Sequence, residues 1–285
     1  TKVAIVTDTT ACIPREQVAR YNIEIVPVQL IFEDKTYRDG IDISPTEFYT
    51  LMQQADKLPT TSSSSPAPYL EAFRRASQRA KSVLCLTEPS KFSAMYTSAL
   101  VAKNMAKTAI PGVALEVIDC TTAAAGQGLV ALAAARAAAS GGSLNEVVEK
   151  ARDIMHRVNL FAMLDTLHYL VKSGRVPQAA AMVNSLLKIK PIFSLNHADA
   201  HTVALPRTIP SAIKRMLKLM APKVERRQPL HVAVMHANAL DKAEALRNRI
   251  SDRFDCAELF ITEFTPVMGV HTGPGLFGIA FYSGD

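Results

Sequence analysis

The sequence predicts an α/β protein of two domains, the first of which is built on a mostly parallel sheet. In the first half of the chain, short apolar runs alternate with helical patterns, and this alternation indicates a parallel sheet with right-handed crossovers. In the second half the alternation is less regular, so we place a domain boundary near Val158, between residues 1–157 and 158–285. The length of 285 residues suits two domains or one large one.

Composition narrows the class of protein without identifying a function. Hydrophobic residues make up 48% of the chain and charged residues 20%, which is ordinary for a soluble globular protein. The net charge of +6 comes from dispersed basic residues without interleaved aromatic side chains, so we expect no nucleic-acid partner. The cysteines never occur at CxxC spacing, which argues against a metal or redox site and indicates buried thiols in a reducing compartment.

The longest apolar run predicts a core helix rather than a membrane span. The run Ala123–Ala139 contains Gln127 and Arg136, and its many alanines suit close helix packing. The chain opens with Thr1–Lys2 and continues directly into an apolar strand, without the pattern of a signal peptide. We therefore expect a cytoplasmic protein with no stable membrane insertion.

Apolar runs and capping signals define the elements of the first half. We expect strands at Val3–Val6, Ile23–Phe32, Val83–Leu86 and Leu115–Asp119. We expect helices after Pro14, at Thr46–Met52, at Tyr69–Lys81, at Ala94–Lys107, within 123–139 and from Leu144 to about Arg157. Two of these helices begin with capping boxes, Ser44–Glu47 and Ser143–Glu146.

Polar loops follow several of the predicted strands. One loop, Thr60–Pro66, has six consecutive hydroxyl residues and should not pack in a core, and a second loop covers Glu88–Ser93. Because ligands gather beyond the carboxyl ends of parallel strands, these loops should meet with Asp8 and Asp119 at one edge of the sheet. Asp8 could act as a phosphoryl acceptor or metal ligand, but we expect it to cap the next turn. The pattern does not identify the ligand.

The second half is predicted from shorter signals. We expect strands at Leu160–Ala162, Ile189–Phe193, His201–Leu205, His231–His236, Leu259–Glu263 and Gly278–Tyr282. We expect helices at Thr166–Lys172, Ala179–Leu187, Ile209–Ala221 and Ala239–Arg253. Before the last strand, Pro266–Gly278 places His271 in a run of small residues that indicates a tight turn. From these residues alone, His271 is equally well explained as a functional group and as an ordinary half-buried histidine.

Seven short motifs lie in order along almost the whole chain. They are Thr7–Pro14, Tyr37–Asp42, Thr61–Pro66, Phe92–Ala99, Asp165–Arg175, Ile189–Ile192 and His271–Gly275. Each motif is weak by itself, but the ordered set is specific, and in it the chain resembles the DegV family, the fatty-acid-binding proteins that serve bacterial fatty acid kinases. The chain departs from the family pattern at Ala94–Met95, where Gly-Thr is usual, and at Ser63–Ser64, where Gln-Pro is usual. These departures are expected to reshape the pocket floor and to make the Thr61 loop more mobile.

The resemblance implies a long-chain fatty acid buried in a cleft between the two domains, with no other cofactor. The carboxyl group would be held by residues with hydroxyl, imidazole or backbone groups, namely Thr61, Ser62, Ser93, His271, Thr272 and Gly273. Burying an acyl chain of ~15 methylenes contributes about 12 kcal/mol before the costs of association are subtracted. The carboxyl group needs such partners because an unmatched buried polar group costs about 2–7 kcal/mol.

The resemblance also implies a fatty acid kinase that phosphorylates the bound acid. The chain itself has neither GxxxxGK[ST] nor GxGxxG, so the kinase would supply the nucleotide site. Arg175 and Arg207 are candidates for contacting this partner, although a surface salt bridge or a solvated face is the ordinary role of such residues.

Two other functions stay open at this point. The first is an acyl hydrolase or transferase with Ser93 as nucleophile and His271 as base, although G-x-S-x-G and a motif-placed acidic partner are both missing. The second is an interaction protein that responds to a small molecule without binding lipid. Ser93 could also serve simply as a helix N-cap.

Overall fold

The first half of the chain forms the parallel sheet that the alternation predicts. The computed structural model describes residues 2–55, 57–177, 179–180 and 189–285. Its first sheet has the order β2-β1-β6-β7, and every pairing within it is parallel. The bounds are β1 Val3–Asp8, β2 Glu24–Val26, β6 Ser82–Thr87 and β7 Ala114–Asp119. As expected, β1 is buried along its whole length.

The second half forms a mixed sheet of six strands in the order β10-β9-β8-β13-β11-β12. The bounds are β8 Asn159–Met163, β9 Ile192–Asn196, β10 Asp199–Ala204, β11 Leu230–His236, β12 Glu258–Glu263 and β13 Phe277–Ser283. The two large sheets lie on either side of Val158 in the sequence, and the division into domains there stays a prediction. The predicted helix Ala179–Leu187 lies largely outside the described residues.

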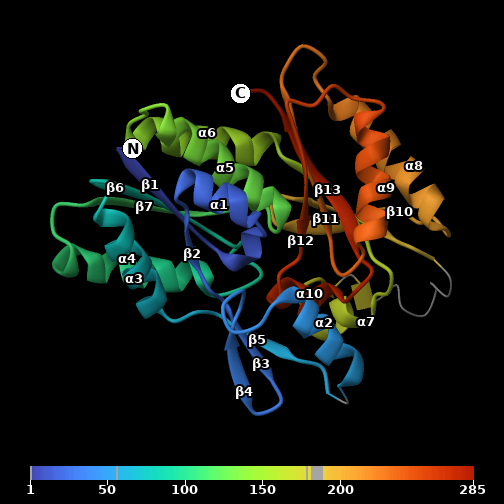
Figure 1. Ribbon diagram of the computed structural model, residues 1–285, viewed down its shortest axis with the longest axis horizontal. Helices are drawn as coiled ribbons and strands as arrows, with labels where there is room; N and C mark the ends of the chain where they lie inside the picture. Colours follow the sequence, from blue (N-terminus) through green and yellow to red (C-terminus); the bar gives the residue numbers. More distant parts are fainter. Residues whose placement is uncertain (1, 56, 178, 181–188) are drawn as a thin grey trace.

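Helices and sheets alternate in layers (Figure 1). Helices α3 (Pro66–Ser77) and α4 (Met95–Ala109) pack on the parallel sheet, and α8 (Ile209–Met220) and α9 (Leu240–Ser251) lie on the outer side of the mixed sheet. Between the sheets lie α5 (Ala125–Ala139) and α6 (Leu144–Arg157). Helix α5 is buried on almost every side and contacts strands of both sheets, which confirms the predicted core helix. Every helix among the described residues falls short of what a membrane crossing requires.

A small third sheet was not predicted. It has the order β4-β3-β5, with β3 Gln29–Phe32, β4 Lys35–Arg38 and β5 Thr60–Ser62. The strand region predicted over Ile23–Phe32 contains two strands, β2 and β3, which belong to different sheets, because Pro27 has no N–H and the chain changes sheets there. The predicted loop Thr60–Pro66 is also wrong in part, since its β-branched threonines pair with β3 and α3 already begins at Pro66.

Local signals set the helix ends and the turn after β1. Both capping boxes form, at α2 (Pro45–Gln54) and at α6. Asp8 caps a short 3-10 helix, Thr9–Ala11, by accepting a hydrogen bond from the Thr10 amide, as expected. Further helical segments in the described part of the chain include α1 Arg15–Tyr21, α7 His168–Ser173, the 3-10 helix Ala221–Lys223 and α10 Pro266–Thr272. All four cysteines are free thiols, and three of them are buried.

Candidate functional site

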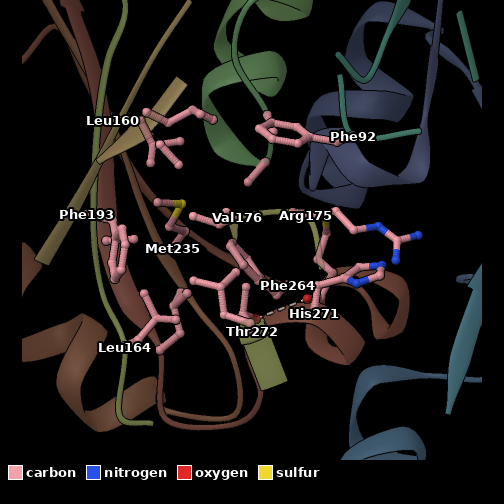
Figure 2. A pocket seen from close by; sticks show the side chains of 18 of the residues that line it. Phe92, Leu160, Leu164, Arg175, Val176, Phe193, Met235, Phe264, His271 and Thr272 are labelled. Carbon is pink, nitrogen blue, oxygen red and sulfur yellow. Dashed lines mark hydrogen bonds between the residues drawn. The ribbon is translucent and has the colours of Figure 1, made fainter. Parts of the chain in front are cut away.

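An apolar pocket lies between the two halves of the chain; it is partly open to solvent, and its empty space, the open part included, amounts to about 790 Å³ (Figure 2). One wall is the face of β8 and its extension that carries Leu160, Ala162 and Leu164, which alternate along the strand. Residues from before Val158, among them Phe92, form the opposite wall. The polar residues of the lining are Glu88, Arg175, Ser194, His271 and Thr272. A long apolar ligand with one polar end therefore matches this pocket.

His271 lies in the last turn of α10, so the tight turn predicted for Pro266–Gly278 is wrong over the first half of that run. Pro266 suits the first turn of a helix, and Gly269 allows this helix to pack close to Tyr49, where a Cβ would lie 2.6 Å from the phenol oxygen. The small residues that suggested a turn therefore allow helix packing. They fix the position of His271 at the pocket.

The His271 imidazole is hydrogen-bonded to Thr61. Thr61 Oγ1 lies 2.9 Å from His271 Nε2, while His271 Nδ1 is buried without a partner among the described residues. Burial, assisted by the charge of Arg175, lowers the pKa of His271 to about 4. The ring is therefore neutral at pH 7 and keeps one nitrogen free for another hydrogen bond.

Strand β5 decides which hydroxyl reaches this histidine. Thr61 is paired with Leu30 of β3, and the alternation of side chains along a strand turns the neighbouring Ser62 to the opposite face. The Ser62 hydroxyl contacts the Ser63 carbonyl oxygen instead, at 3.5 Å. The structure thus brings Thr61, and not Ser62, to His271.

Ser93 lies just before α4 and does not act as its N-cap. The N-cap residue is Ala94, without a side-chain cap hydrogen bond, and Ser93 Oγ accepts only a long hydrogen bond of 3.4 Å from the Met95 amide. Ser93 lies close enough to the Glu88 carboxyl group to oppose the rise in the pKa of that group. Ser93 itself is not among the residues that line the pocket, and it lies beside the polar part of the lining, near Glu88.

The two departures from the family pattern contact each other. Ser63 Oγ accepts a hydrogen bond from the Ala94 amide at 3.0 Å, and the Ser64 amide donates to Met95 Sδ at 3.2 Å. Ser64 is 1% exposed, and its hydroxyl donates to the Pro27 carbonyl oxygen. The segment that the sequence predicts to be mobile is therefore tied to α4 and to the chain before β3.

Sequence reasoning missed Glu88, the acidic residue of the pocket. Burial and, to a smaller extent, the charge of Asp8 raise the pKa of Glu88 to about 7, while Ser93 and Arg175 oppose the shift. The Glu88 amide donates to Asp8 Oδ2 at 2.9 Å, so the ends of β1 and β6 meet as predicted. The signal that could have identified Glu88 is its position directly after a buried strand.

Arg175 lies at the mouth of the pocket. It lines the apolar pocket and also an adjoining polar depression that contains Thr61, Tyr169 and His271. Figure 2 shows its guanidinium group beside the His271 ring. Arg207 is exposed and does not line this pocket. Of the two predicted partner-binding residues, only Arg175 is therefore near the site.

Thr272 and Gly273 complete the end of α10. The Thr272 hydroxyl donates to the Met268 carbonyl oxygen at 3.0 Å, although the residue also lines the pocket. Gly273 ends the helix at φ 73° and ψ 169°, a conformation that is essentially restricted to glycine. A Cβ at Gly273 would lie 2.1 Å from the Tyr169 ring.

The Gly273→Ala variant is expected to lose about 3 kcal/mol of unfolding free energy. Backbone strain accounts for about 1–3 kcal/mol, and displacement of the Tyr169 ring adds an overpacking cost. Urea denaturation followed by circular dichroism measures the loss. Gly141 is also at positive φ, but a Cβ added there would lie in open space. The Gly141→Ala variant therefore measures the loss of stability that comes from backbone strain alone. Equal losses in the two variants would contradict the proposed role of the close Tyr169 contact.

Comparison with known proteins places the chain in a family. A family model described as "Uncharacterised protein, DegV family" matches residues 2–284. DegV domain-containing proteins of Streptomyces coelicolor and Halalkalibacterium halodurans are 33% and 30% identical over 283 residues. Each alignment covers 99% of this chain, with 98% of the first relative and 99% of the second.

Solved structures agree with this assignment. A fatty-acid-binding DegV family protein from Thermus thermophilus is similar over 99% of this chain and 100% of its own, with a TM-score of 0.91 and 27% identity. DegV from Bacillus subtilis, a fatty acid binding protein, gives a TM-score of 0.89 and 28% identity over 99% of both chains. Since the family model and these relatives match nearly the whole sequence, the chain belongs to the DegV family.

Proposed function

We propose that this protein binds a long-chain fatty acid, with the acyl chain in the apolar pocket and the carboxyl group near His271. The observation that carries the proposal is an apolar pocket with a neutral, incompletely hydrogen-bonded imidazole in its lining. The DegV proteins of Thermus thermophilus and Bacillus subtilis, which are described as binding fatty acids, support it. In this proposal Thr61, Ser93 and His271 hold the head group.

His271 can form a hydrogen bond to the carboxyl group of the fatty acid without carrying a positive charge. A neutral imidazole donates through one nitrogen and accepts through the other, so a free nitrogen beside a Thr61 hydroxyl can bond a carboxyl oxygen. Arg175 at the mouth supplies the positive charge that a carboxylate attracts. Ser93 is then available if its hydroxyl turns toward the ligand.

We further propose that the protein is a carrier that presents the carboxyl group to a fatty acid kinase. The polar depression beside the pocket contains Thr61, Arg175 and His271, so the head-group end of the pocket is the end open to a partner. Arg175 is exposed there and is the better candidate for partner contact, whereas Arg207 would contact a partner at a greater distance from the pocket mouth. The function requires no chemistry from the carrier itself.

The hydrolase alternative is less well supported by these contacts. His271 Nε2 is hydrogen-bonded to Thr61 rather than to Ser93, and Ser93 does not line the pocket. A nucleophile activated by a base needs the two side chains within hydrogen-bonding reach of each other. Incubation with an activated acyl ester followed by mass spectrometry separates the two functions, because a carrier leaves Ser93 unmodified and an acyl adduct on Ser93 contradicts the carrier.

Filling the pocket tests the proposed function directly. Ala162 lies in the β8 wall, so Ala162→Phe is expected to reduce palmitic acid affinity at least tenfold by occupying the space of the acyl chain. Isothermal titration measures the affinity, and thermal unfolding checks that the variant folds. The exposed Ala257→Phe is the matched control and should bind as the wild type does. Undiminished binding in a folded Ala162→Phe variant would place the acyl chain elsewhere.

A further inference from the structure

A second, polar pocket adjoins the apolar one; it is partly open to solvent, and its empty space, the open part included, amounts to about 600 Å³. Its polar lining comes from segments far apart in the sequence. These residues include Thr121, Thr122, His156, Asn196, His197 and Lys223. Nothing in the proposed function so far uses them.

Three segments run from one pocket into the other. At the start of β8, Val158 (the residue before the strand) and Asn159 line the polar pocket, and the next residue, Leu160, lines the apolar pocket. After β7, the Thr121–Thr122 pair lines the polar pocket and the next two residues line the apolar pocket. On β9, Leu195 lines both. The two pockets are therefore neighbours that share part of their lining.

The polar pocket lies at the end away from the proposed head group. In Figure 2, the His271 ring lies at the right of the apolar pocket beside Arg175, and Leu160 lies across the pocket at the upper left. Val158 precedes Leu160 in the chain, and the path from Leu164 to Val158 spans about 20 Å at ~3.3 Å per residue. An extended acyl chain bound at His271 would thus point its far end toward the polar pocket.

The chemistry of the polar pocket favours a hydrogen-bond acceptor or an anion. Within the described part of the chain its lining contains no Asp or Glu, and Lys223 has no ion pair there. The His156 and His197 rings lie 6.0 Å apart and face the same space. The Thr122 Oγ1 atom is buried without a hydrogen-bond partner among the described residues. These groups supply donors and positive charge without a competing carboxylate.

We propose that the polar pocket is a second subsite for the same ligand, which accepts a polar group at the far end of the acyl chain. The ligand class then includes long-chain dicarboxylic and ω-hydroxy acids in addition to simple fatty acids. A carboxylate at the end of a closed apolar tunnel would be buried without partners and would be rejected. Here it meets Lys223 and two imidazoles. This inference rests on the proposed function.

Paired titrations of hexadecanoic and hexadecanedioic acid test the subsite. The wild type is expected to bind the dicarboxylic acid within tenfold of the monocarboxylic acid. The double variant His197→Asn, Lys223→Gln should weaken the dicarboxylic acid at least tenfold and leave the monocarboxylic acid within twofold. Asn is chosen because residue 197 has φ 49°, which asparagine tolerates. Lys218→Gln on α8 is the control and should change neither affinity.

The outcomes separate the subsite from the function on which it rests. A dicarboxylic acid that binds a thousandfold more weakly than the monocarboxylic acid would overturn the subsite while leaving the proposed function intact. Equal weakening of both acids in the double variant would also overturn it, because the polar pocket would then only shape the tunnel. If neither acid binds the wild type, the proposed function fails and the subsite fails with it.

Discussion

Replacing His271 with alanine is expected to weaken long-chain fatty acid binding by about ten- to a hundredfold, because a hydrogen bond to a charged group contributes about 1.5–3 kcal/mol. The imidazole is held by Thr61 at 2.9 Å and is neutral at pH 7, so the variant removes a hydrogen-bonding partner of the carboxyl group and no charge. Isothermal titration with palmitic acid measures the loss. Thermal unfolding should show that the variant folds.

Two further variants sharpen this prediction. The exposed His201→Ala, on the edge strand β10 of the second sheet, controls for the loss of a histidine and should bind normally. Ser93→Ala should weaken binding as well, by less than His271→Ala, because His271 lines the pocket and the Ser93 hydroxyl must turn toward it to reach the ligand. Unchanged affinity in both Ser93→Ala and His271→Ala would contradict the head-group assignment.

The Glu88→Gln variant is expected to be more stable than the wild type at pH 8, by up to about 3 kcal/mol, and equally stable near pH 4.5. The native pKa of Glu88 is about 7, raised from an ordinary 4.5 chiefly by burial. Between these values the native state holds a proton that the unfolded state has lost, so wild-type stability falls as pH rises from about 4.5 to about 7. Glutamine removes this dependence at position 88.

Urea denaturation of both proteins at several pH values measures the Glu88 contribution. The pKa of Asp39 is also raised by burial, to about 6, and that of Asp8 is raised, so both contribute in the same direction. Subtracting the variant from the wild type cancels the Asp39 contribution, whereas part of the Asp8 contribution stays in the difference because Asp8 and Glu88 interact. The same carboxylate faces the pocket, so fatty acid affinity should rise as pH falls through 7 in the wild type only. A stability difference that does not change with pH would refute the assignment.

Much of the fold could be predicted because its signals are local. The two capping boxes and the apolar run that forms β1 are signals contained within a few consecutive residues. Each of these elements is found where the sequence predicts it. The sheet change at Pro27 and the pairing of Thr60–Ser62 depend on distant partners, which the sequence around them does not reveal. Helix α10 was missed because glycines that permit close packing resemble glycines that make turns.

The candidate site was only partly predictable. The motifs around Thr61 and His271 identified two residues that the structure brings within hydrogen-bonding distance, from positions far apart in the chain. Glu88 was missed because its importance comes from burial in the pocket, which no motif encodes. The contact between Ser63–Ser64 and Ala94–Met95 could not be predicted for a similar reason. The sequence shows that both segments differ from the family pattern, but their hydrogen bonds to each other form only in the folded chain.

Native mass spectrometry of the purified protein, followed by denaturing extraction and lipid analysis, tests the central claim most directly. The proposed function predicts a bound species with the mass of a saturated or monounsaturated long-chain acid, released on denaturation. If the purified protein is free of lipid, titration with a fluorescent fatty acid should restore binding in the wild type and not in Ala162→Phe. A lipid-free protein that also fails to bind the fluorescent acid would contradict the claim that the apolar pocket holds a fatty acid.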